Sequence, residues 1–140
     1  QEVHFPPLKS TMIKANSVLA IMGNKDSVAQ FAEAYGLKVS PKLTVFAELL
    51  HSARAGLSEA VIPPSSQFVG KEARELHMRR NYKLHVLALC RGDTVIQGNE
   101  LNNSILRTGD TLGIFSTWEA LHEFQNNPDF FVLTTTFPRE

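Results

Sequence analysis

The sequence predicts an α+β fold in which small β-sheets carry helices packed on one face. Short apolar runs of strand character, such as residues 60–62 and 111–115, alternate with segments whose apolar residues recur at helical spacing, such as residues 25–35. A strand–turn–helix pattern also occurs twice along the chain. A chain of 140 residues is long enough to bury a core without a disulfide or a metal ion.

The N-terminal elements are a strand and a helix. Residues 18–22 (VLAIM) form a continuous apolar run, which is typical of a buried strand. A helix is expected at residues 25–35, with Asn24 or Asp26 as its N-cap and a glycine after its end. Ser40 and the proline after it can begin another helix. The apolar residues that follow suit a strand equally well, so both alternatives stay open.

More elements are predicted in the second half of the chain. Two prolines stop a short strand at residues 60–62, and Ser65 or Ser66 is expected to cap a helix over residues 69–81. The strand at residues 83–91 fills with apolar side chains and is predicted to be central. The remaining predictions are a strand at 94–96, a polar loop at 99–103, a strand at 111–115 after the turn Gly109-Asp110, and a helix at 117–126 begun by Thr117.

The strand–turn–helix pattern repeats at an offset of 93 residues without a gap. Ile21 then aligns with Ile114 and Phe31 with Phe124, although few positions are identical. Any strand–helix pair shares some of this pattern, but the length of the match favours a duplication. The resulting division gives the C-terminal half of a first unit at 1–40, a linker at 41–56, a complete second unit at 57–133 and a tail at 134–140.

Composition argues against several classes of function. Fourteen basic and fourteen acidic residues balance, which argues against a dominant surface for nucleic acid. The single cysteine, Cys90, can form no internal disulfide. No apolar run approaches the roughly 20 residues of a membrane span, and no signal peptide is expected. Both ends of the chain are expected to be cut from a larger protein.

No residues have the spacing of a catalytic or metal centre, so the sequence predicts no enzyme. The five histidines are scattered, without the paired spacing of zinc ligands. No serine has a recognisable histidine and aspartate context. No G-x-G-x-x-G motif follows a strand, so a dinucleotide-binding half is not expected.

Residues 57–133 resemble the TrkA-C domain, the C-terminal module of the RCK regulators of potassium transport. The resemblance lies in five stretches: EAVIPPSS at 59–66, VGK at 69–71, RNY at 80–82, VLALCRG at 86–92 and LRTGDTL at 106–112. The first unit departs from it, because Asn16-Ser17 stands where Gly109-Asp110 would be.

The resemblance implies a role in transport. Tandem TrkA-C modules resemble the insertion found in permeases of the sodium-coupled dicarboxylate/sulfate symporter class, and also occur in aspartate–alanine exchangers. Such a pair implies a place on the cytoplasmic face of the plasma membrane, with the parent protein's transmembrane segments as partners, and a homodimer. Some TrkA-C modules bind a cyclic dinucleotide between two subunits. The expected function is ligand sensing or dimerisation in a transporter, and the alternative is a purely structural dimerisation module.

The candidate ligand-binding residues surround the predicted helix at 69–81. The hydroxyls of Ser65 and Ser66, together with free N–H groups at the helix start, are expected to hold an anion. Arg79, Arg80 and Arg91 are expected to donate charged hydrogen bonds to a carboxylate, a phosphate or a cyclic dinucleotide. The alternative for Arg79 and Arg80 is a role as surface charges near a helix C-terminus.

Overall fold

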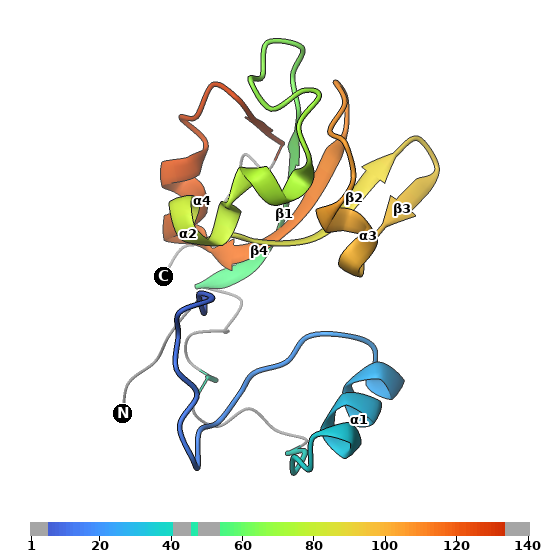
Figure 1. Ribbon diagram of the computed structural model, residues 1–140. Helices are drawn as coiled ribbons and strands as arrows, with labels where there is room; N and C mark the ends of the chain where they lie inside the picture. Colours follow the sequence, from blue (N-terminus) through green and yellow to red (C-terminus); the bar gives the residue numbers. More distant parts are fainter. Residues whose placement is uncertain (1–5, 41–45, 48–53, 134–140) are drawn as a thin grey trace.

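The computed structural model describes residues 6–40, 46–47 and 54–133. Its largest part is one antiparallel sheet of five strands in the order β3-β2-β4-β1-β5 (Figure 1). The strands are β1 (Ala55–Val61), β2 (His85–Arg91), β3 (Thr94–Ile96), β4 (Thr111–Thr117) and β5 (Phe131–Val132). β1 begins inside the predicted linker, and β4 rather than β2 is the middle strand.

Helices cover one face of this sheet, as predicted. They are the 3-10 helix η1 (Ala73–Leu76) and the α-helices α2 (Met78–Tyr82), α3 (Gly98–Asn102) and α4 (Trp118–Phe124). The alternate residues Leu112 and Ile114 of β4 are fully buried in this core. The Thr117 hydroxyl accepts a hydrogen bond from the Ala120 N–H at 3.2 Å, so the predicted cap of α4 is confirmed.

The predicted single helix at residues 69–81 is wrong. The Gly70 N–H donates to the Leu106 carbonyl at 2.8 Å, and Glu72 forms a bridge with Ile105, so residues 70–72 run beside another segment. η1 starts only after Glu72, and His77 (φ 46°) then separates η1 from α2. The Ala73 N–H donates to the Ser104 carbonyl and the Lys71 carbonyl accepts from the Leu106 N–H, each at 2.8 Å. Tertiary hydrogen bonds therefore take two backbone groups that a helix beginning at residue 69 would pair internally.

The predicted polar loop at residues 99–103 is also wrong, because α3 occupies most of it. Leu101 lies on this helix and is 6% exposed, in contact with the core. One buried leucine among polar residues is enough to fix a single helical turn against the sheet.

The N-terminal helix α1 (Lys25–Ala34) agrees with the sequence. The Asn24 side chain accepts a hydrogen bond from the Ser27 N–H at 2.8 Å, and Gly36 ends the helix in a left-handed conformation. The predicted strand at residues 18–22 is wrong: this segment pairs with no other strand described here, and Val18 is 47% exposed. A strand needs a neighbour for its hydrogen bonds.

The two predicted units, a partial one at 1–40 and a complete one at 57–133, are therefore not both evident in the described part of the chain. Within the predicted linker, residues 41–45 and 48–53 lie outside the described residues, as does the tail at 134–140. Both alternatives for the helix or strand after Ser40 fall mostly on those positions. None of the helices that the structure describes is long and apolar enough to cross a membrane.

Candidate ligand-binding cavity

A cavity of about 1100 Å³ lies where the N-terminal residues 7–10 meet the helices of the sheet domain. η1, α2 and α3 supply most of its wall. Its floor is apolar and consists of side chains that are also part of the buried core: Leu76, Met78, Leu84, Leu101 and Leu112.

The rim of the cavity is basic. Four cationic side chains line it, Lys9, Arg74, Arg79 and Arg80, against one carboxylate. That carboxylate, Glu75, already accepts a hydrogen bond from the Glu72 N–H at 2.8 Å. Arg74 is paired with Glu72 at 3.0 Å. Within the described residues no ion pair engages the other three cations, so the rim favours an anion.

The short helix α2 positions Arg79 and Arg80. Met78 and Leu84 are buried on either side of them and anchor the segment to the core. His77 and Lys83 both adopt left-handed backbone conformations (φ 46° and 59°), which confine the helix to five residues. The two arginines are thereby held on the exposed side of a segment that is fixed at both ends.

His85 follows α2, and the charge of Arg79 on that helix affects its pKa. Burial lowers the pKa of His85, and the positive charge of Arg79 lowers it further. Both effects favour the neutral imidazole over the imidazolium beside the arginines.

Ser65 and Ser66 do not lie on the cavity. Ser66 is 6% exposed, and its hydroxyl accepts a hydrogen bond from the Phe68 N–H at 3.1 Å within a turn. Neither serine caps a helix, because the first helical turn begins at Ala73. The predicted anion site at a helix start is therefore wrong in its geometry.

Arg91 is engaged by a buried carboxylate. Its Nε and Nη2 donate to the two oxygens of Asp110, each at 2.8 Å, and Nη2 also donates to the Ile105 carbonyl. Burial alone would raise the pKa of Asp110, but the hydrogen bonds from Arg91 and the Arg107 N–H outweigh it and lower that pKa below 3.8. The pair ties β2 to the turn before β4.

The cavity unites only two of the five predicted ligand residues, Arg79 and Arg80. It adds Lys9 and Arg74, which the sequence analysis missed as candidates. Nothing in the sequence near Lys9 indicates a site, since its neighbours across the cavity are more than sixty residues away. Among the described residues, no group of three or more His, Cys, Asp or Glu side chains is placed to hold a metal ion.

Two curated relatives are named as uncharacterized transporters. The uncharacterized transporter sll0640 of Synechocystis is 24% identical over 139 residues, which is 94% of this chain and 22% of that protein. The uncharacterized transporter YfbS of Escherichia coli is 29% identical over 66 residues, 47% of this chain and 11% of that protein. The chain thus spans about a fifth or less of the relatives it matches.

Solved structures with a similar shape include two RCK C domains in complex with cyclic di-AMP. The domain of the potassium transport protein KtrA is 20% identical with a TM-score of 0.46, covering 74% of this chain and 99% of that one. The domain dimer of BusR from S. agalactiae is 15% identical with a TM-score of 0.44, covering 54% of this chain and 89% of that one.

The model of the TrkA-C domain family matches residues 57–128, just over half of the chain. This match covers the elements from β1, except for its first two residues, to α4, and it includes the wall formed by η1, α2 and α3. The chain belongs to the TrkA-C domain family.

Proposed function

We propose that this chain is the regulatory, ligand-sensing domain of a membrane transporter and that it binds a small anion in the cavity beside α2. The observation that carries the proposal is a cavity of about 1100 Å³ with an apolar floor. On its rim, Lys9, Arg79 and Arg80 have no described carboxylate partner. Unpaired cations at the mouth of an apolar cavity favour a ligand with negative charge and an apolar body.

A cyclic dinucleotide has this chemistry. Its two phosphates match the two neighbouring arginines of α2, and its flat bases match the floor of Leu76, Met78 and Leu112. Mononucleotides, dicarboxylates and sulfate carry charge as well, but they leave more of the apolar floor uncovered. Cyclic di-AMP, the compound held by the KtrA and BusR domains, is the first ligand to test.

The parent protein in this proposal is a permease of the sodium-coupled dicarboxylate/sulfate symporter class. Similarity to a transporter along 94% of this chain supports it. The domain would lie on the cytoplasmic face as the second of two TrkA-C units, with residues 1–40 as part of the first. A ligand would regulate transport by binding one arrangement of the domain better than another.

A thermal-shift screen tests the ligand. At 100 times its dissociation constant, a ligand adds about 2.7 kcal/mol of stability, which gives a clear rise in Tm. The double substitution Arg79→Ala with Arg80→Ala should abolish the rise. Arg107→Ala removes an arginine that does not line the cavity and should leave it intact. No rise with any of the four classes of anion would refute the proposal.

A second candidate function is dimerisation without a ligand. On the sheet face opposite the helices, one residue from each of the five strands forms a row across the sheet. Neighbouring strands pair these residues in register: Val95, Cys90, Thr111, Val61 and Phe131. Val95 is 59% exposed and Phe131 62% exposed. A second copy could cover this row. A dimer mass that Phe131→Glu converts to a monomer mass, with no ligand-induced rise in Tm, would favour this function.

A further inference from the structure

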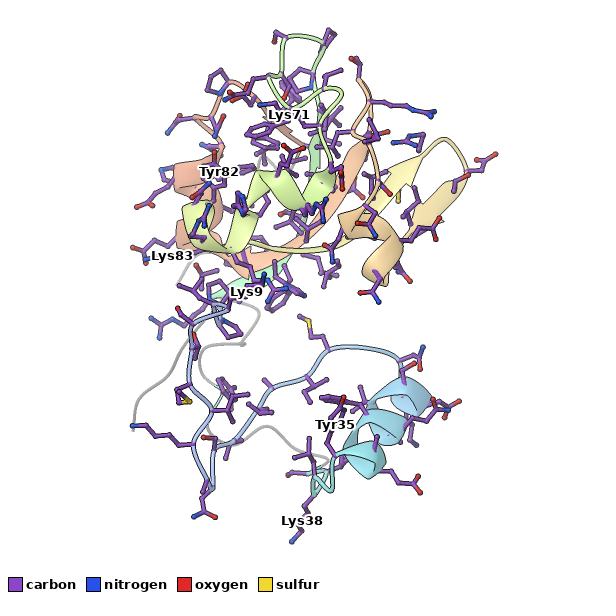
Figure 2. The ribbon with its side chains drawn as sticks, viewed as in Figure 1. Lys9, Tyr35, Lys38, Lys71, Tyr82 and Lys83 are labelled. Carbon is purple, nitrogen blue, oxygen red and sulfur yellow. The ribbon has the colours of Figure 1, made fainter. Side chains whose placement is uncertain are left out.

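We propose that Lys9 is part of the anion site and that a bound anion fastens residues 7–10 onto the sheet domain. This inference rests on the proposed function, since it assigns a further contact and a consequence to the same cavity. Residues 7–10 form one wall of the cavity, opposite the wall formed by η1, α2 and α3. Figure 2 shows Lys9 where the N-terminal segment comes up to the domain.

The N-terminal segment is held weakly in the absence of a ligand. Its described hydrogen bonds stay within the segment: the Leu8 N–H donates to the Thr11 hydroxyl at 2.9 Å, and the Thr11 N–H donates to the Leu8 carbonyl at 3.0 Å. Among the residues that the structure describes, no hydrogen bond or ion pair joins residues 6–12 to residues 54–133. The segment can therefore move away without breaking a hydrogen bond.

Charge makes the unliganded arrangement weaker still. Lys9 shares the cavity with Arg79 and Arg80, and like charges repel across such a space. An anion placed between them reverses the sign of the interaction, because it attracts the cation of the segment and the two cations of the domain together. The ligand then acts as a bridge, and its binding free energy includes the docking of residues 7–10.

The volume of the cavity is consistent with a ligand that binds beneath residues 7–10 rather than one that displaces them. About 1100 Å³ remains open with residues 7–10 in place, and ligand sites commonly measure roughly 300–1000 Å³. A ligand thus has room beneath the segment and need not displace it. The N-terminal segment is consequently held loosely without the anion and fixed when the anion binds. Such a ligand-dependent structural change is what a sensor domain requires.

Hydrogen exchange of the full chain, with and without cyclic di-AMP, tests the bridge. Amide exchange in residues 8–12 should slow at least several-fold on binding. Slower exchange in η1 and α2 with unchanged or faster exchange in residues 8–12 would overturn the bridge and leave the ligand site intact. The absence of any effect on exchange or Tm would instead overturn the proposed ligand, and the bridge with it.

Affinity measurements separate Lys9 from the general charge of the chain. Lys9→Gln should weaken cyclic di-AMP binding about tenfold by calorimetry, and it should also remove the slowing of exchange in residues 8–12. Lys14→Gln is the matched control, since Lys14 is a nearby exposed lysine that does not line the cavity. Equal affinities of the two variants would overturn the role of Lys9, whereas loss of binding confined to the α2 arginine variant would keep the ligand site without the bridge.

Discussion

Replacing Asp110 by alanine is expected to destabilise the domain by about 3 kcal/mol, the lower end of the range of roughly 3–5 kcal/mol for breaking a buried ion pair. Asp110 is 1% exposed, and its carboxylate accepts three hydrogen bonds at 2.8 Å, two from Arg91 and one from the Arg107 N–H. The lower end applies because the Arg91 side chain is 28% exposed and can turn its freed donors to water.

Urea unfolding followed by circular dichroism measures this loss. With a denaturant slope of about 2 kcal/mol per molar urea, the midpoint should fall by about 1.5 M. Arg74→Ala is the control, because it breaks the exposed Arg74–Glu72 pair, whose side chains are 64% and 31% exposed. That exposed pair should contribute less than about 1 kcal/mol. An Asp110→Ala loss no larger than the Arg74→Ala loss would refute the assignment of Arg91 to a structural pair.

Two further predictions concern acid and close packing. The lowered pKa of Asp110 means that its stabilisation is present above the unfolded pKa of about 3.9 and is lost as pH falls through the lower folded pKa. The difference in urea midpoint between the natural chain and Asp110→Ala should therefore shrink as pH falls below about 4. A constant difference would contradict this. Gly56→Ala should cost about 1–3 kcal/mol because an added Cβ would lie 2.4 Å from Trp118 Cζ2. Gly113→Ala, where the nearest atom is 3.9 Å away, is the control in the same urea unfolding experiment, and equal losses would show that the indole does not set the cost.

The elements that could be predicted are those whose signals are local. β4 follows the glycine turn at Gly109 (φ 88°), and α4 starts at a threonine cap, so each boundary depends on neighbouring residues. The helix expected at 69–81 failed because its competitor is distant. The Gly70 N–H and the Lys71 carbonyl bond to Leu106, and the Ala73 N–H donates to the Ser104 carbonyl. No periodicity within 69–81 reveals these partners. Tertiary hydrogen bonds thus override the local helix propensity of these residues.

The residues of the candidate site also divide into those with a local sequence signal and those placed only by tertiary structure. Arg80 lies in the family stretch RNY at 80–82 and Arg79 directly precedes it, so the sequence offered both as candidates. Arg91 lies in another family stretch, VLALCRG at 86–92, but its partner Asp110 comes nineteen residues later, and nothing in the spacing showed that the two would pair. Lys9 reaches the cavity only through the path of the N-terminal segment, which depends on tertiary structure.

Residues 18–22 show what separates a strand sequence from a strand. They align with residues 111–115 of β4, and both stretches are strongly apolar. β4 has β1 on one side and β2 on the other, so its amides are bonded and Leu112 is fully buried. In the described chain, residues 18–22 have no such neighbours, and their apolar side chains are 40–48% exposed where their exposure is given. The difference lies in the partners rather than in the local sequence, so the repeat can form a second sheet only if strands equivalent to β1 and β2 are supplied to it.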